Sequence, residues 1–195
     1  MFLRVIRLER NGLGIRLIFW MVGVIPSGTL GDARRMASLV AEAGAGAVLM
    51  HMRGDPATMG ALARYASVCA EVAAELAGAV ARARAAGVSD RALVLDPGIG
   101  FAKTPAQSME VLSDLSPLRA LGFPILVGPS RKSFLGAVLG VPPERRAVGT
   151  AAACVVAYLG GARIFRVHDV EPVAQALAVA HAIVTAGRGG EVKAS

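Results

Sequence analysis

Four apolar runs in this chain each end in a cluster of polar residues, and this arrangement limits the folds that the chain can adopt. With the residues that follow them, the runs are 47–53 (AVLMHMR), 92–98 (ALVLDPG), 124–132 (PILVGPSRK) and 163–169 (RIFRVHD). Each interval between them can hold a helix, which predicts an α/β fold with a parallel sheet. Because parallel strands carry their chemistry at their carboxyl ends, we expect the four polar clusters to converge on one site.

The pattern of apolar residues predicts where the strands and helices lie. Strands are expected near residues 17–25, 47–52, 93–96, 125–128 and 164–168. Helices are expected at residues 32–43, 58–86 (with a break near Ser67 or Gly78), 104–122, 130–139, 144–159 and 171–185. Thr104, Pro105 and Gln107 form the signature of a capped helix start. A complete (β/α)8 barrel needs about 250 residues. Counting therefore favours either a short open sheet or the carboxyl part of a barrel, with about four to five βα units.

Composition and charge narrow the possible partners. The chain of 195 residues carries a net charge of +7, which favours anionic partners. It shows no recognition-helix pattern and no basic patch interleaved with aromatic residues, so we expect no nucleic-acid binding and favour a phosphorylated small molecule. The two cysteines, Cys69 and Cys154, are predicted to be buried free thiols. Residues 17–25 follow several arginines but are too few to span a bilayer, so we expect no membrane association and a cytoplasmic location.

Two of the polar clusters suggest chemistry directly. Asp96, at the end of a predicted strand, could accept hydrogen bonds from a ring N–H group, or it could mark only a strand-to-turn junction. Arg166 and His168 lie two residues apart and therefore on the same face of a strand. Arginine can bind a phosphate with two parallel hydrogen bonds, and histidine can exchange a proton. The alternative for Arg166 is a buried ion pair with Asp169.

The other two clusters allow both a binding and a purely structural interpretation. Ser130, Arg131 and Lys132 follow a strand and open a predicted short helix, a placement that favours anions. They could instead form a solvated basic turn. His51 is more typical of a hydrogen-bonded histidine at a strand end than of a catalyst. Met50 beside it could contact a flat heteroaromatic ring.

These motifs together resemble the signatures of the dihydropteroate synthase family. The matching stretches are LMHMRG at 49–54, LDPGIGF at 95–101, GPSRKSF at 128–134 and RVHDV at 166–170. The resemblance covers about residue 27 to the end and implies part of a TIM-barrel-type (β/α) fold, usually in a homodimer. It also implies the reaction, in which the amine of 4-aminobenzoate attacks the exocyclic methylene of 6-hydroxymethyl-7,8-dihydropterin diphosphate. The products are 7,8-dihydropteroate and diphosphate, and Mg²⁺ assists the departure of diphosphate.

The resemblance implies substrate-binding roles for residues at the ends of the predicted strands. These are Met50, Asp96, Gly128 and Lys132 for the pterin, Arg166 and His168 for the diphosphate, and Phe101, Ser130 and Arg131 for the aminobenzoate. Of these, we expect Lys132, Arg166 and His168 to be catalytic. The family's metal-side asparagine has no counterpart in this sequence, so the metal ligands stay unassigned.

The chain departs from the family at its amino-terminal side. Signatures that the family carries on its earlier strands are not found here. We therefore predict a divergent leader at residues 1–22 and a partial pterin-binding barrel domain at residues 23–195. One hypothesis is a synthase, alone or with a complementing chain. A second is a catalytically inactive remnant that binds pterin and diphosphate. A third is another pterin-binding transferase, such as a methyltetrahydrofolate methyltransferase, and the motifs at 130–133 and 166–170 argue against it.

Overall fold

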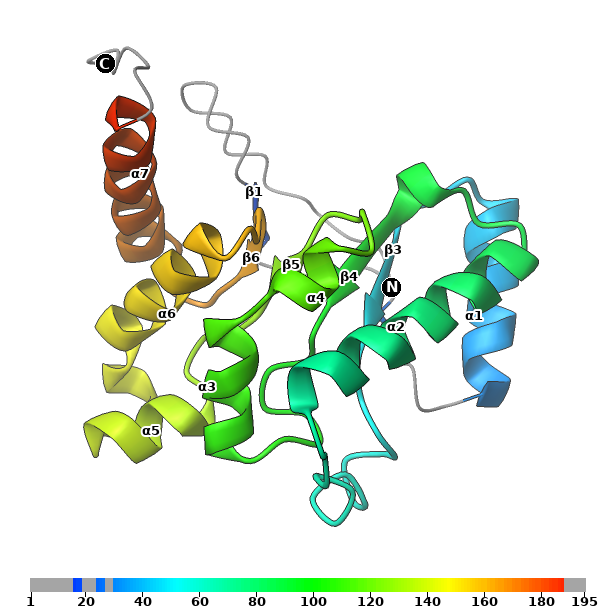
Figure 1. The fold of residues 1–195 in the computed structure, drawn as a ribbon, viewed down its shortest axis with the longest axis horizontal. Coiled ribbons are helices and arrows are strands. Elements are labelled where there is room, and N and C mark those ends of the chain that lie inside the picture. Colours follow the sequence, from blue (N-terminus) through cyan, green and yellow to red (C-terminus); the bar gives the residue numbers. More distant parts are fainter. Residues whose placement is uncertain (1–15, 19–23, 27–29, 188–195) are drawn as a thin grey trace.

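The computed structural model describes residues 16–18, 24–26 and 30–187 of the chain. The strands are β1 (Arg16–Ile18), β2 (Val24–Pro26), β3 (Ala47–Met50), β4 (Leu93–Asp96), β5 (Leu126–Val127) and β6 (Ile164–Arg166). The helices are α1 (Leu30–Glu42), α2 (Val68–Ala85), α3 (Pro105–Ser113), α4 (Ser116–Arg119), α5 (Ser133–Leu139), α6 (Ala147–Leu159) and α7 (Val170–Ala186), with 3-10 turns at Asp90–Ala92 and Pro143–Arg145. The strands run through the middle of the molecule, with α1 and α2 at one end and α6 and α7 at the other (Figure 1).

All the described strand pairs are parallel; β2 to β6 follow one another in sequence order, and β1 lies beside β6. The pairings give β2-β3-β4 and β5-β6-β1. The backbone N–H of Leu95 donates to the carbonyl of Pro124 (2.9 Å), and Leu95 forms a bridge with Ile125, which joins the two groups. This order is typical of a (β/α) barrel, because a doubly wound sheet reverses its strand order. β1 lies beside the last strand, where the first strand of a barrel would be.

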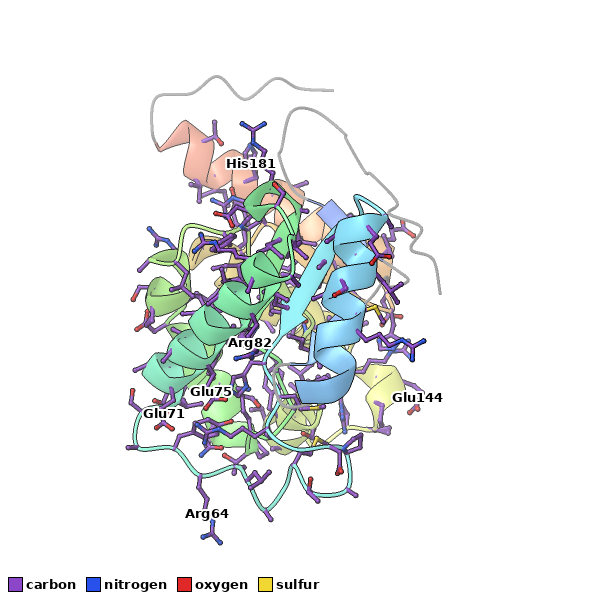
Figure 2. The ribbon with its side chains drawn as sticks, turned by 90° about the vertical axis from the view of Figure 1, so that its right-hand side faces the viewer. Arg64, Glu71, Glu75, Arg82, Glu144 and His181 are labelled. Atoms are coloured by element: carbon purple, nitrogen blue, oxygen red, sulfur yellow. The ribbon has the colours of Figure 1, made fainter. Side chains whose placement is uncertain are left out.

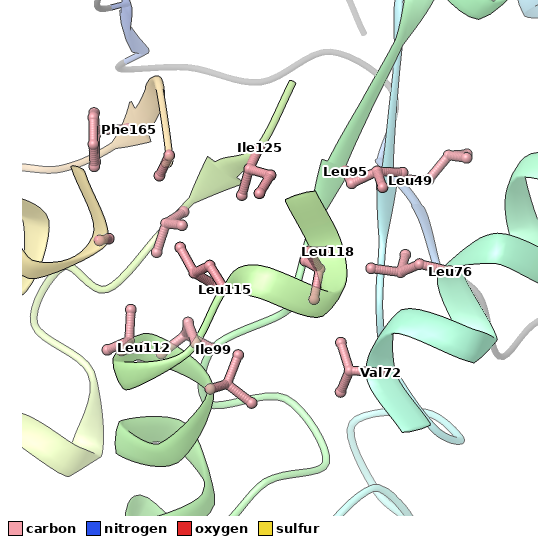
Figure 3. Close-up of a cluster of buried hydrophobic side chains, with 14 of the residues drawn as sticks. Leu49, Val72, Leu76, Leu95, Ile99, Leu112, Leu115, Leu118, Ile125 and Phe165 are labelled. Carbon is pink, nitrogen blue, oxygen red and sulfur yellow. The ribbon is translucent and has the colours of Figure 1, made fainter. Parts of the chain in front are cut away.

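Side chains along the strands alternate between two apolar clusters. The larger cluster lies between the sheet and the helices. In it Leu49 and Leu95 from the strands pack near Leu76 of α2 and Leu118 of α4 (Figure 3). The alternate strand positions form a second cluster of Leu126 and Ile164, with Val48 and Val94 packed against it. Both faces of these parallel strands are therefore apolar, as expected for the inner and outer faces of a barrel wall.

The predicted helix over residues 58–86 is wrong in its first part. Residues 56–62 form turns, and α2 begins only after Ser67. The Asp55 carboxylate accepts a hydrogen bond from the backbone N–H of Thr58 (2.8 Å), which closes a turn in place of a helix. Glu71 accepts a hydrogen bond from the backbone N–H of Ser67 (3.0 Å) and so stabilises the helix start at that point.

Three other sequence predictions need correction, and one is confirmed. The single strand predicted at residues 17–25 is wrong, because β1 and β2 lie at opposite ends of the strand order; residues 19–23 lie outside the described part. The helix predicted at residues 104–122 is divided into α3 and α4. The helix predicted at 130–139 begins at Ser133, so Ser130 and Arg131 precede it. The capping box of Thr104 and Gln107 is confirmed in both directions.

Two further expectations concern the cysteines and the membrane. Cys69 and Cys154 are both buried and free, as predicted. Among the described helices, none has the length and apolar composition that crossing a membrane requires.

Candidate functional site

The carboxyl ends of β4 and β6 bring together a fully buried carboxylate and a guanidinium. Asp96, with none of its surface exposed, ends β4, and Arg166 ends β6. One Asp96 carboxylate oxygen lies 2.9 Å from Nη2 of Arg166, and the other accepts the backbone N–H of Gly98 (2.8 Å). Met50, the last residue of β3, is buried and lies opposite Asp96 in the strand register. The predicted convergence of polar strand ends is therefore observed for these residues.

A glycine at the end of β5 leaves the room that Arg166 occupies. A Cβ atom added to Gly128 would lie 2.9 Å from Nη2 of Arg166 and 3.1 Å from its Nε. Any larger residue at position 128 would push the guanidinium away from Asp96. Gly128 thus leaves space for the guanidinium that pairs with Asp96.

Lys132 is directed at an aromatic ring of the loop that follows β4. Its Nζ lies 3.9 Å from the centre of the Phe101 ring, a distance typical of a cation–π contact. Burial lowers the pKa of Lys132, and the positive charge of Arg166 lowers it further, while Asp96 opposes the shift. Lys132 therefore belongs to the same electrostatic environment as the Asp96–Arg166 pair.

Ser130 and His168 form a second polar pair at the ends of β5 and β6. The Ser130 hydroxyl accepts the backbone N–H of His168 (3.1 Å) and lies 2.8 Å from its Nδ1. The side chain of His168 is exposed. In the tautomer that carries the ring proton on Nε2, the Ser130 hydroxyl donates its proton to Nδ1. This tautomer presents an N–H donor to an anion.

Arg131 makes the ion pair that sequence reasoning offered as an alternative for Arg166. Its Nε and Nη2 lie 3.1 and 2.8 Å from the two carboxylate oxygens of Asp169. The alternative Arg166–Asp169 pair is therefore wrong. Arg131 also has a left-handed backbone (φ 58°), and its N–H donates to Oγ1 of Thr150 (3.2 Å). The guanidinium of Arg131 thus forms a bidentate ion pair with Asp169.

A partly buried polar network around His51 was not predicted from the sequence. His51 has none of its surface exposed; its Nε2 lies 3.0 Å from Glu75 and its Nδ1 lies 2.8 Å from Nζ of Lys103. Arg53 pairs with Glu75 and with Glu71 (2.7 Å). Both glutamates lie near one end of α2 (Figure 2). The interpretation of His51 as a hydrogen-bonded strand-end residue is confirmed. The sequence signal for the glutamates of this network was the i, i+4 spacing of Glu71 and Glu75.

This network makes stability depend on pH. Burial lowers the pKa of His51 to about 4, helped by the charge of Lys103 and opposed by Glu75. An unfolded histidine titrates near 6.5, so between about 6.5 and 4 the unfolded chain binds more protons, and the free energy of unfolding falls as pH falls. We expect a shallower loss of stability for His51→Gln over this window. Denaturant unfolding at several pH values would measure it, and parallel profiles for the two proteins would contradict the assignment.

The described residues do not supply a metal site from ionisable side chains. Within residues 16–18, 24–26 and 30–187, no group of three or more His, Cys, Asp and Glu residues is arranged to hold a metal ion. Mg²⁺ in phosphate-binding sites is commonly held by one or two carboxylates together with substrate oxygens and water, so its ligands stay unassigned among the described residues.

Known proteins are similar to this chain in sequence and in fold. Residues 21–168 match the family described as "Pterin binding enzyme". The dihydropteroate synthase of Synechocystis is 50% identical over 137 residues, which are 70% of this chain and 47% of the relative. Two crystal structures of dihydropteroate synthase from Thermus thermophilus, with 6HMPPP and with 4-aminobenzoate, have TM-scores of 0.75 and 0.76 at 43% identity. The matches cover 83% and 84% of this chain and 64% and 66% of those chains. The chain spans about half the length of the curated relatives it matches.

Proposed function

Because this chain belongs to the family of pterin-binding enzymes, with dihydropteroate synthases as relatives, we propose that it serves the synthase condensation in folate biosynthesis. The substrates would be 6-hydroxymethyl-7,8-dihydropterin diphosphate and 4-aminobenzoate. The observation that carries the proposal is the buried Asp96–Arg166 pair beside Lys132 at the strand ends. It offers a hydrogen-bond acceptor for a pterin and cations for a diphosphate in one place.

In this proposal the residues bind and orient the substrates and stabilise the leaving group. The Asp96 carboxylate accepts hydrogen bonds from the pterin ring, and Lys132 donates to it. Arg166 and the Nε2–H of His168 bind the diphosphate. The amine nitrogen of aminobenzoate attacks the methylene carbon, a C–N bond forms, the C–O bond to diphosphate breaks, and the amine loses a proton. An arylamine is already a nucleophile at neutral pH, so positioning and charge stabilisation supply most of the catalysis.

The roles of several residues are part of the proposal. Met50 would line the pterin site and Gly128 would keep Arg166 in reach of it. Phe101, Ser130 and Arg131 would lie near the aminobenzoate, and Arg131 also pairs with Asp169. Mg²⁺ would assist the departure of diphosphate, as the family resemblance implies. Since the described residues hold no group of three or more His, Cys, Asp and Glu side chains for a metal ion, its ligands are unassigned and we derive no step from it.

The proposal also covers the organisation of the protein. We take residues 23–195 as the pterin-binding domain and residues 1–22 as a divergent leader, of which β1 pairs with β6. The partner would be a second copy, in a homodimer, or a complementing chain. The location would be cytoplasmic.

The first test is diphosphate release by the purified chain. The chain is given the pterin diphosphate, 4-aminobenzoate and Mg²⁺, and both diphosphate and dihydropteroate are measured. Release that depends on aminobenzoate supports the synthase. Full release without aminobenzoate, or product at the uncatalysed rate, would contradict it.

One observation favours a second candidate, a catalytically inactive remnant or a subunit that needs a partner. The six described strands end at β2 on one side and β1 on the other, whereas a closed barrel of this type has eight. Under this alternative, calorimetry would detect pterin binding without turnover, and turnover would appear only when the complementing chain is added.

We expect Lys132→Ala to lower turnover at least about tenfold, a loss of roughly 1.4 kcal/mol of transition-state stabilisation. The reason is that Lys132 supplies a cation next to Asp96 and Arg166. Steady-state kinetics would measure the loss, with Arg84→Gln as the control. Arg84 forms an exposed ion pair with Asp90, and its substitution should leave turnover unchanged. Wild-type turnover in Lys132→Ala would remove Lys132 from the site.

A further inference from the structure

The loop between β4 and α3 has an unusual backbone that other residues must hold. Gly98, Gly100 and Ala102 all have positive φ angles of 66°, 75° and 46°. Ala102 is buried, and a non-glycine residue in this region costs about 1 kcal/mol or more. A Cβ atom on Gly98 would collide with the carbonyl oxygen of His51. Such a backbone persists only when the surrounding contacts determine it.

The ammonium group of Lys103 is the central contact of this loop. Lys103 is buried, and its Nζ donates to the carbonyl oxygens of Gly98 (3.3 Å) and Phe101 (3.2 Å) and lies 2.8 Å from Nδ1 of His51. An ammonium has three N–H donors, so all of them are used. The loop therefore folds around the ammonium group of Lys103. The glycines of the loop and the capping box of α3 do not account for the burial of this cation.

Further side chains fix Lys103 and the strained residue Ala102. Because Nδ1 of His51 accepts from Lys103, the ring proton is on Nε2 and is donated to Glu75 (3.0 Å). On the other side, the hydroxyl of Tyr65 donates to the carbonyl of Ala102 (2.8 Å). The loop is thus held from α2 and from the segment that follows β3.

The held loop carries groups of the candidate site. Its first N–H, at Gly98, donates to the Asp96 carboxylate (2.8 Å). The ring of Phe101 lies under the ammonium of Lys132 (3.9 Å). The carbonyls of these two loop residues are the ones that Lys103 binds. A change at Lys103 would therefore reach both Asp96 and Lys132 without direct contact.

We propose that Lys103 is a positioning residue for the binding of the pterin diphosphate. Its ammonium group binds the carbonyls of Gly98 and Phe101 and so holds the loop that contacts Asp96 and Lys132. The inference rests on the proposed function for its ligand. The positioning role requires the charged form of Lys103, because only the ammonium donates to all three acceptors.

The requirement for charge gives the inference a pH dependence. Burial lowers the pKa of Lys103 to about 7; Asp96 and Glu75 oppose the shift, and Arg53 adds to it. The charged or titratable groups around Lys103 are Asp96 from β4, Glu75 from α2, and His51 and Arg53 from the segment after β3. Pterin diphosphate binding should therefore weaken as pH rises through about 7.

The test compares Lys103→Met, which has similar length but no donor, with Lys103→Arg, which keeps its charge at all relevant pH values. Calorimetry measures the Kd for the pterin diphosphate well below and well above the Lys103 pKa. We expect Lys103→Met to bind at least about tenfold more weakly at the lower pH, which equals about 1.4 kcal/mol. Lys103→Arg should lose the wild-type pH dependence. The titration of the ligand itself is common to all proteins, so differences between them isolate Lys103.

A measurement without ligand separates this inference from the proposed function. Hydrogen exchange of the backbone amides of residues 98–103, at one fixed pH, should be faster in Lys103→Met, with α7 unchanged. If wild type binds no pterin diphosphate, the proposed function fails, and faster exchange still supports the role of Lys103 in the loop. The role of Lys103 would be overturned by unchanged amide exchange in Lys103→Met, or by equal Kd values and pH profiles in wild type and Lys103→Met.

Two further variants guard against a folding defect. Tyr65→Phe removes only the hydrogen bond to Ala102 and keeps the ring that contacts Arg53. It should shift Kd and loop exchange in the same direction as Lys103→Met, by less. Arg84→Gln, at an exposed ion pair of α2, should change neither. If Lys103→Met does not fold, Lys103→Arg decides, since a wild-type pH profile in that variant overturns the inference.

Discussion

Arg166→Ala should destabilise the protein by about 3–5 kcal/mol and, in any active preparation, reduce turnover at least about tenfold. The stability effect follows from Asp96, whose side chain is fully buried and whose ion-pair partner at 2.9 Å would be lost. A buried carboxylate without its cation keeps the cost of desolvation and loses the compensating attraction. The turnover effect follows from the loss of a cation for the diphosphate.

A double variant separates these two effects. Asp96→Asn combined with Arg166→Ala removes the uncompensated charge, so it should recover much of the stability lost in Arg166→Ala. It should not recover turnover. Arg163→Ala is a control near the start of the same strand, since the exposed Arg163 donates to the carbonyls of Tyr158 and Ala162. Denaturant unfolding and steady-state kinetics supply both readouts. If Arg166→Ala retained wild-type stability, the buried pair would not exist in solution.

Phe165→Ala should cost about 3–5 kcal/mol of unfolding free energy, because it removes a large side chain from the main core. Phe165 has none of its surface exposed and is the central residue of β6, on the side of the strand that faces the larger cluster (Figure 3). The cavity left behind cannot fill without moving β6 against β5.

Two controls define what this result would mean. Phe165→Leu keeps much of the volume and should cost less than half as much. Val148→Ala, on the exposed side of α6, should change stability by about 0.5 kcal/mol or less, because Val148 is 81% exposed. Unfolding free energies from urea titration would give all three values. A loss at position 165 similar to that at 148 would contradict the described core.

Sequence reasoning predicted most of the strands and the clusters at the strand ends because these features are local. An apolar run that ends in Asp96 or Arg166 is visible in the letters, and so is the capping box at Thr104. The helix predicted from residue 58 is wrong because the prediction followed an Ala-rich pattern and took no account of the side chain of Asp55. The carboxylate of Asp55 closes a turn, and no periodicity of apolar residues reports that.

The partners of the site residues could not be predicted, because they depend on the spatial order of the strands. Asp96 and Arg166 are 70 residues apart and meet across β5. The nearest acid in the sequence, Asp169, was the natural alternative for Arg166, but it pairs with Arg131. Lys103 was overlooked for the same reason, since it lies in the loop after β4 and its partner His51 follows β3.

Each strand from β3 to β6 contributes a member of the candidate site, and this distribution links ligand occupancy to the cohesion of the whole sheet. A ligand that binds only the assembled strand ends stabilises the folded state by RT ln(1 + [L]/Kd), about 2.7 kcal/mol at a hundredfold excess over Kd. The thermal midpoint should then rise with ligand concentration. A fragment that lacks any one of these strands would show no such rise, so ligand-induced thermal shifts would report whether the sheet is assembled even when no chemistry takes place.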